Sequence, residues 1–200
     1  MLSIQKRRKR ALFLGPAHEN LFKHIKVSTD LVSQEEKIEI QKVEEIMPDL
    51  IISYGYRHII PKEVFEKYRT INMHISYLPY NRGADPNFWS FKDKTPKGVS
   101  IHEVVSKLDA GDIIYQKQVN FPPECDTLFL TYEFLKKEIE ALLVSNWPDI
   151  IAGNYETKEQ DHSKSTYHRR AELSSYWKQL SLGWNTNIEE ISCLKEVTYK

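Results

Sequence analysis

The sequence is poor in cysteine and has no long apolar run. Its two cysteines, Cys125 and Cys193, lie far apart, without the clustered spacing of a zinc site or the density of a disulfide framework. A reducing compartment is therefore the simpler interpretation, and we expect a cytoplasmic protein. No stretch reaches the length of a membrane-spanning helix, and the apolar run at residues 11–14 is too short for the hydrophobic core of a signal peptide.

Charge of one sign is not in excess either, because 28 basic and 28 acidic side chains cancel. A balanced chain produces no overall field that would attract nucleic acid or a membrane surface, so a charged ligand has to be held by local contacts. Residues 6–10 form one basic run, which could contact nucleic acid. Since the overall charge is balanced, we favour a solvated lead-in to the first strand and expect no nucleic-acid partner.

Clustered metal ligands and internal repeats are missing too. The histidines His58, His74 and His102 are dispersed, and neither an H-E-x-x-H spacing nor a Cys/His cluster accompanies them. We therefore expect no metal. A chain of 200 residues suits one compact domain with a small appendage, and two domains of full size would not fit.

What the sequence does contain is an alternation of short apolar runs with segments of helical spacing. The runs predict strands, and the spaced apolar residues predict helices. Strands are expected within residues 10–15, 49–56, 70–75, 97–105 and 111–119. Helices are expected within residues 18–26, 33–48 with Ser33 as N-cap, 61–68, and 126–151 with Asp126 as cap. Residues 26–33, between the first two helices, leave room for at most a very short strand.

This alternation is typical of the α/β class, with a mainly parallel sheet flanked by helices. Sheets of this kind bind ligands beyond the carboxyl ends of their strands. The core is expected to close near residue 152, which predicts a main domain over residues 1–152 and a C-terminal extension over residues 153–200. The extension is expected to form a linker, a short helix and an irregular tail.

Two polar side chains lie at the end of the strand expected within residues 70–75. Asn72 and His74 are two residues apart, so both should project from the same side of that strand. An imidazole can take up and return a proton, and an asparagine amide can donate to an oxyanion, which together suit acyl or formyl transfer. Taken alone, an N-x-H pair more often satisfies backbone groups at a strand end. Asp109, in a turn closed by Gly111, would orient His74 if the two side chains lay together.

Ordered motifs carry a resemblance to a known family. N-x-H-x-S-x-L-P over residues 72–79 is followed by R-G-A over 82–84, G-V-S-I-H over 98–102 and L-D-x-G-D-I over 108–113. In this order and spacing they resemble the N10-formyltetrahydrofolate-dependent formyltransferases. That family includes glycinamide ribonucleotide transformylase, methionyl-tRNA formyltransferase and the sugar-nucleotide N-formyltransferases. The resemblance implies a Rossmann-like sheet with the active site at its carboxyl edge.

The same resemblance implies roles for individual residues. The catalytic asparagine, histidine and aspartate of the family match Asn72, His74 and Asp109. N10-formyltetrahydrofolate is implied as co-substrate, held mostly by backbone groups in the loop at residues 54–60 and in the turn at residues 105–109. The residues expected at the folate are Tyr56, Arg57, His58, Ile59, Ile60, Val105 and Lys107. Arg57 and His58 are equally well explained as a solvated loop tip.

The acceptor side resembles the sugar-nucleotide enzymes most, in residues 75–91 and 161–173. Those enzymes formylate 4-amino-4,6-dideoxyhexoses for bacterial surface polysaccharides such as the O-antigen of lipopolysaccharide. A nucleotide sugar needs cations or amides for its pyrophosphate and a flat ring for its base, and suitable side chains are Tyr80, Arg82, Trp89 and Tyr167. For Trp89 a place in the core is the favoured alternative.

Other acceptors and classes remain open. Transfer to methionyl-tRNA is disfavoured, since only about fifty residues follow the catalytic region and no strongly basic surface is evident. The purine-pathway reaction is disfavoured because residues 13–22 do not form a glycine-rich phosphate loop. A non-catalytic folate or sugar-nucleotide binding protein on the same scaffold is the competing class. The resemblance favours a homodimer.

Overall fold

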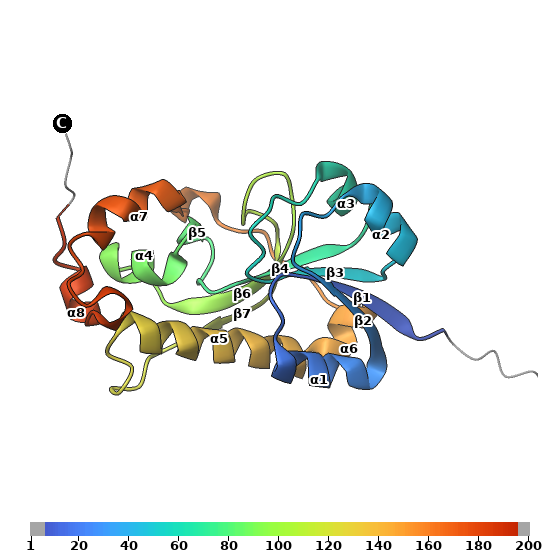
Figure 1. Ribbon diagram of the computed structural model, residues 1–200, viewed down its shortest axis with the longest axis horizontal. Coiled ribbons are helices and arrows are strands. Elements are labelled where there is room, and N and C mark those ends of the chain that lie inside the picture. Colours follow the sequence, from blue (N-terminus) through green and yellow to red (C-terminus); the bar gives the residue numbers. More distant parts are fainter. Residues whose placement is uncertain (1–6, 196–200) are drawn as a thin grey trace, which may run out of the picture. The chain divides into compact units, whose positions relative to one another are not determined.

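The structure is a computed structural model that describes residues 7–195. The chain divides into two compact units. Unit 1 contains the described residues up to Met73 together with Leu143–Glu156, and unit 2 contains His74–Leu142 and the described residues from Thr157 onward. Figure 1 shows the elements of both units coloured along the chain. The domain boundary expected near residue 152 stays a prediction.

Unit 1 is built on parallel strands in the order β2-β1-β3-β4. The central strands β1 and β3 carry runs of fully buried residues, as parallel strands covered on both faces do. In Figure 1, α2 and α3 lie on one face of these strands and α1 and α6 on the other. The unit therefore confirms a mainly parallel sheet flanked by helices. Its elements are β1 (Lys9–Leu14), α1 (Glu19–Ser28), β2 (Thr29–Gln34), α2 (Ile40–Ile46), β3 (Leu50–Ser53), α3 (Lys62–Lys67), β4 (Thr70–His74, whose last residue opens unit 2) and α6 (Trp147–Ala152).

The helix predicted from Ser33 onward is wrong at its start. Ser33 lies in β2, a six-residue strand that pairs in parallel with β1, where we expected a very short strand at most. The backbone pairing with β1 holds this segment extended, and the helical spacing of the residues that follow does not reveal it. The helix begins only at Ile40, and Ile38 is buried just before it, with its N–H donating to Tyr56 Oη over 2.8 Å.

The basic run was expected to be a solvated lead-in to the first strand. Lys6 lies outside the described residues. Arg7 and Lys9 both pair with Asp49, at 3.0 and 3.2 Å, and their side chains are exposed. These cations therefore have carboxylate partners within unit 1.

Across residues 7–195 the helices are too short or too polar to cross a membrane.

Unit 2 combines an antiparallel strand pair with several helices and a small second sheet. Strands β6 and β7 pair antiparallel, and the two-residue strands β5 and β8 pair in parallel. Helices α4, α7 and α8, labelled in Figure 1, share an aromatic core that contains Phe88, Trp89, Tyr176 and Ile191. The elements are β5 (Arg82–Gly83), α4 (Pro86–Lys92), β6 (Gly98–Glu103), β7 (Ile113–Gln118), α5 (Leu128–Ser145, whose last three residues fall in unit 1), η1 (His162–Lys164), β8 (Tyr167–His168), α7 (Arg170–Trp177), η2 (Gly183–Asn185) and α8 (Ile188–Ile191).

The single helix predicted over residues 126–151 is interrupted. Helix α5 ends at Ser145 and α6 begins at Trp147, with Pro148 in the first turn of α6. Proline lacks an N–H donor and clashes with the preceding turn, so it starts a new helix more readily than it continues one. The cap of α5 is also one residue later than expected, because Thr127 Oγ1 accepts a hydrogen bond from the Leu130 N–H at 3.2 Å.

Candidate active site

His74 is the last residue of β4 and the first residue of unit 2. Its ring is buried, with Nε2 3.0 Å from the carbonyl oxygen of Asn81 and Nδ1 3.8 Å from Oδ2 of Asp109. A carbonyl oxygen only accepts, so Nε2 carries the donated proton and the ring orientation is fixed. Nδ1 is then the nitrogen that can take up a further proton, beside a carboxylate that would stabilise the resulting cation. Asn72 precedes His74 by two residues in β4, which puts both on one side of the strand.

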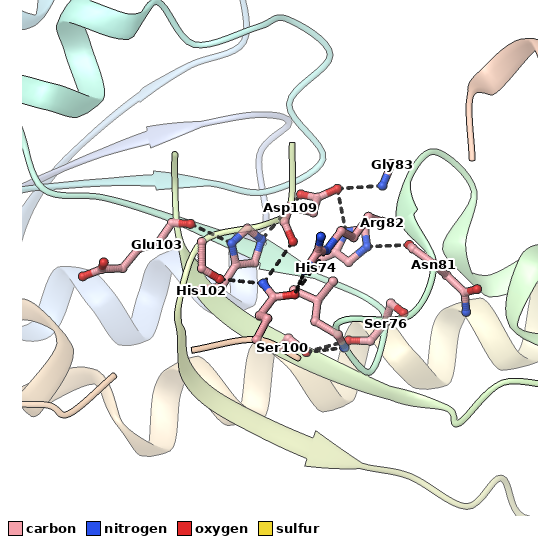
Figure 2. A network of polar contacts seen from close by, with 12 residues as sticks. His74, Ser76, Asn81, Arg82, Gly83, Ser100, His102, Glu103 and Asp109 are labelled. Atoms are coloured by element: carbon pink, nitrogen blue, oxygen red, sulfur yellow. Dashed lines mark hydrogen bonds and ion pairs between the residues drawn. The ribbon is translucent and has the colours of Figure 1, made fainter. Parts of the chain in front are cut away.

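Asp109 lies between two imidazole rings (Figure 2). Its Oδ1 is 3.5 Å from Nε2 of His102, and its Oδ2 accepts a hydrogen bond of 2.8 Å from the Gly83 N–H. Nδ1 of His102 in turn donates to the carbonyl oxygen of Glu103 at 2.8 Å. Burial opposes ionisation of Asp109, but His74, His102 and the Gly83 N–H outweigh it and hold the pKa of this carboxyl well below its usual range. The site therefore holds a buried carboxylate at neutral pH.

Two glycines allow this arrangement. Gly83 has φ +90°, and a Cβ there would lie 2.3 Å from the carbonyl oxygen of His168. A Cβ on Gly111 would lie 2.0 Å from the carbonyl oxygen of Glu103. Only glycine fits at both positions, so the Gly83 N–H and the turn after Asp109 can come close to their neighbours.

Arg82 is a buried cation next to Gly83, with 1% of its surface exposed. Its Nε and Nη2 donate to Oε1 of Gln160 at 3.2 and 2.7 Å, and Nη2 lies 2.9 Å from Nδ1 of His162. Its Nη1 is buried without a hydrogen-bond partner among residues 7–195. Burial lowers the pKa of Arg82, and the charge of Asp109 opposes that effect.

The loop after His74 is fastened to the strand pair of unit 2. Ser100 Oγ donates to the Ser76 carbonyl oxygen at 2.7 Å and accepts from the Leu78 N–H at 3.1 Å. Gln116 Nε2 donates both to the Leu78 carbonyl oxygen and to Ser100 Oγ, each at 2.8 Å. The N-x-H-x-S-x-L-P motif and the G-V-S-I-H motif are therefore in direct contact, through Ser76, Leu78 and Ser100. Two motifs that the sequence only orders along the chain form one polar network (Figure 2).

The residues expected at the folate lie on two loops, one in each unit. In unit 1, Tyr56 is half-buried and its hydroxyl donates to the Glu36 carbonyl oxygen at 2.9 Å. Ile60 is buried, whereas the side chains of Arg57, His58 and Ile59 are exposed. In unit 2, Val105 and Lys107 are exposed on the loop that follows β6. Their contacts with a folate stay predictions.

The four residues expected at the acceptor, all in unit 2, differ widely in exposure. Trp89 is buried and stacks on the His168 ring, with centroids 3.9 Å apart and planes at 4°. Tyr80 is half-buried, Arg82 is buried, and Tyr167 is 51% exposed. Sequence reasoning missed Gln160, because it lies in a polar stretch without apolar periodicity, and it gave His162 no role of its own within residues 161–173. Within residues 7–195, no group of three His, Cys, Asp or Glu side chains is placed to hold a metal ion.

Comparisons with known proteins agree on one family. The formyl transferase family model matches residues 7–145. Methionyl-tRNA formyltransferase of Bacillus subtilis (strain 168) is 34% identical over 193 residues, which are 93% of this chain and 58% of that protein. This chain spans about half the length of the curated methionyl-tRNA formyltransferases that it matches.

Solved structures resemble the chain over nearly its whole length. The formyltransferase PseJ from Anoxybacillus kamchatkensis, in complex with UDP-4,6-dideoxy-4-formamido-L-AltNAc and tetrahydrofolate, has a TM-score of 0.85 and 39% identity. The match covers 91% of this chain and 97% of PseJ. A 4-N formyltransferase from Francisella tularensis has a TM-score of 0.73 at 23% identity, covering 96% of this chain and 89% of that one, and shares the fold.

Proposed function

Because the chain belongs to the formyl transferase family, we propose that it transfers a formyl group from N10-formyltetrahydrofolate to the amine of a nucleotide-linked amino sugar. The observation that carries this proposal is the buried carboxylate of Asp109, which lies 3.8 Å from the His74 ring. His74 belongs to β4, the strand that also contains Asn72. The sequence motifs predict an asparagine, a histidine and an aspartate as the catalytic set, and the distance between His74 and Asp109 supports the pairing of two of them. Such a set can stabilise an oxyanion and move a proton.

The proposed reaction is a direct transfer. The neutral amine of the acceptor attacks the formyl carbon, a new C–N bond forms, and the carbonyl oxygen becomes an oxyanion. The Asn72 amide stabilises that oxyanion, and so does the His74 imidazole once it has taken up the proton of the amine, with Asp109 stabilising the resulting charge on His74. His74 accepts the proton lost by the amine and returns it to N10 as the C–N10 bond breaks. The products are the formamido sugar and tetrahydrofolate.

Support for a sugar acceptor comes from PseJ. That protein is 39% identical to this chain, which covers 97% of it, and its structure holds a UDP-linked 4-formamido-4,6-dideoxy sugar with tetrahydrofolate. A UDP-linked 4-amino-4,6-dideoxyhexose is therefore the first acceptor to test, and a dTDP-linked one is the second. Such a product would serve bacterial surface-polysaccharide synthesis, including O-antigen. Tyr80, Arg82, Trp89 and Tyr167 are the proposed acceptor contacts.

A second candidate acceptor is methionyl-tRNA. It is favoured by the curated relatives, since the methionyl-tRNA formyltransferase of Bacillus subtilis is 34% identical over 93% of this chain. The length of the match to PseJ favours the sugar instead. Glycinamide ribonucleotide is a third acceptor, and folate or sugar-nucleotide binding without turnover is the non-catalytic alternative.

One assay separates these candidates. Purified protein is mixed with N10-formyltetrahydrofolate and one acceptor at a time, and both tetrahydrofolate release and acceptor formylation are followed. The acceptors are UDP- and dTDP-linked 4-amino-4,6-dideoxyhexoses, glycinamide ribonucleotide and methionyl-tRNA. We expect turnover with an amino sugar, and most strongly with the UDP-linked one. Turnover with methionyl-tRNA alone would overturn the assignment of a sugar acceptor. Binding without turnover of any acceptor would overturn the proposal that the protein is an enzyme.

A further inference from the structure

We propose that Gln160 is a positioning residue that holds the catalytic carboxylate of Asp109 in place. The inference rests on the proposed function, because it concerns the aspartate of that reaction. Gln160 is buried, with 5% of its surface exposed, and it lies outside residues 7–145, to which the family model extends. The segment that follows residue 157 would then contribute directly to the geometry of the active site.

The Gln160 amide uses all of its main hydrogen-bonding positions. Its Nε2 donates to the carbonyl oxygens of Asp109 and Gly111, at 3.0 and 2.5 Å. Its Oε1 accepts from Nε and Nη2 of Arg82, at 3.2 and 2.7 Å. Carbonyl oxygens only accept and a guanidinium only donates, so these partners fix which end of the amide is oxygen and which is nitrogen.

These contacts close a ring around Asp109. Gln160 holds the backbone of Asp109, and it also holds Arg82, whose neighbour Gly83 donates its N–H to Oδ2 of Asp109 at 2.8 Å. Both ends of the aspartate are therefore held, the backbone by Gln160 and the carboxylate by Gly83. The backbone of Asp109 has φ +50°, in the left-handed region that a non-glycine residue adopts only with support from its surroundings.

The segment that carries Gln160 is anchored without the Gln160 side chain. Lys158 pairs with Ile113 through two backbone hydrogen bonds of 2.8 Å, and the Arg82 N–H donates to the Thr166 carbonyl oxygen at 3.0 Å. A substitution at Gln160 should therefore leave the segment in place and remove only its hold on the turn that carries Asp109. A shift of about 1 Å in a catalytic group can lower the rate about 100-fold.

Two variants separate the donor bonds of the Gln160 amide from its full set of hydrogen bonds. Gln160→Glu keeps an acceptor for Arg82 but removes both donors to the carbonyl oxygens of Asp109 and Gly111. Gln160→Met keeps the side-chain length and removes all of these bonds. The exposed neighbour Glu159 provides the matched control, Glu159→Gln.

We expect both Gln160 variants to lose kcat by about 10- to 100-fold, with the KM for N10-formyltetrahydrofolate unchanged. The amide resonance of Gly83 in an NMR spectrum should move in both variants, because its hydrogen bond to Asp109 changes. A merely structural role would lower the folded fraction and leave kcat per folded molecule unchanged. Glu159→Gln should match the wild type in every measurement.

Wild-type turnover is measured first, so that the proposed formyl transfer and the positioning role of Gln160 can fail separately. If the wild type formylates no acceptor, the proposed function fails. The Gly83 amide resonance then tests the positioning role of Gln160 by itself, because the NMR measurement needs no substrate. Wild-type kcat in a folded Gln160 variant, or a Gly83 resonance at its wild-type position, overturns the inference. If Gln160→Glu does not fold, the same two measurements on Gln160→Met decide.

Discussion

Oδ2 of Asp109 lies 3.8 Å from Nδ1 of His74, beyond hydrogen-bond length but within the range of an ion pair. Both side chains are buried, so water screens this interaction little. Catalytic contacts are often long in a structure without substrate and shorten when the reaction complex forms. In the proposed reaction, this pair would have to shorten and stabilise a charge on His74.

Replacement of His74 by glutamine should remove the proton transfer and keep the fold. The glutamine amide would keep a donor for the Asn81 carbonyl oxygen, which Nε2 of His74 contacts at 3.0 Å, but an amide cannot accept and return a proton. We expect kcat to fall by about 10²- to 10⁴-fold. Steady-state kinetics on His74→Gln test this, with exposed His24→Gln as control. A wild-type rate in His74→Gln would remove the proton-transfer role.

Asn72→Ala tests the oxyanion donor. Removal of one such donor lowers kcat by about 10²- to 10³-fold in enzymes that stabilise an oxyanion. We expect that loss with little change in the KM for N10-formyltetrahydrofolate, because the amide acts on charge that develops only in the transition state. Exposed Asn120→Ala serves as control. A raised KM with an unchanged kcat would assign Asn72 to substrate binding instead.

Asp109→Asn should change how stability depends on pH. The pKa of Asp109 lies below the value of about 3.9 for an unfolded chain. Ionised Asp109 therefore stabilises the fold above that pH, and the stabilisation is lost as the pH falls toward the lower folded-state value. We expect the wild type to be more stable than Asp109→Asn at neutral pH, and the difference to shrink below about pH 4.

Urea unfolding of both proteins at a series of pH values measures the Asp109 effect. The exposed Asp126→Asn variant is the control, and its stability should follow the wild type at each pH. A difference between wild type and Asp109→Asn that stays constant down to about pH 3 would contradict the prediction.

The sequence predicts those features that depend on local patterns. The alternation of apolar runs and helical spacing is enough to predict the parallel strands β1, β3 and β4 with their helices, and the ordered motifs are enough to indicate the family. The proximity of Asp109 and His74 could only be stated as a condition before the structure placed them 3.8 Å apart. The catalytic roles of both residues stay predictions.

The features that the sequence does not reveal depend on distant pairing. Strands β5 and β8 have two residues each and are separated by more than eighty positions, so neither shows a period of two. Gln160 lies in a polar stretch, and its importance comes from buried carbonyl oxygens elsewhere in the chain. Helix α4 begins at Pro86, and its aromatic residues pack in a core completed by α7 and α8. Such contacts carry no local signal.

Gly83→Ala should disturb the contact between Gly83 and Asp109. A Cβ at Gly83 would lie 2.3 Å from a backbone oxygen of His168, so the strand pair β5–β8 would have to separate. The matched control is Gly183→Ala, where φ is also positive, at +53°, but the nearest atom lies 3.9 Å away. We expect Gly183→Ala to lose about 1–2 kcal/mol from left-handed strain alone.

Gly83→Ala should lose about 1–3 kcal/mol more of its free energy of unfolding than Gly183→Ala, because of overpacking. It should also lower kcat, because the N–H that holds Oδ2 of Asp109 is displaced. Urea unfolding and steady-state kinetics measure the two effects. Equal losses of stability in the two alanine variants would show that the close contact with His168 carries no cost.

Trp89 and Tyr167 should respond differently to substitution, although both are proposed acceptor contacts. Trp89 is 4% exposed and packs against Phe88, Tyr176 and His168, so Trp89→Ala should cost about 3–5 kcal/mol of stability. Tyr167 is 51% exposed, and Tyr167→Ala should leave the free energy of unfolding almost unchanged.

If Tyr167 contacts the acceptor, its loss raises the KM for the amino sugar and leaves the KM for N10-formyltetrahydrofolate at the wild-type value. Tyr167→Phe keeps the ring, so an unchanged KM in that variant would assign the contact to stacking. An unchanged acceptor KM in Tyr167→Ala would exclude Tyr167 from the acceptor site, whatever the result at Trp89.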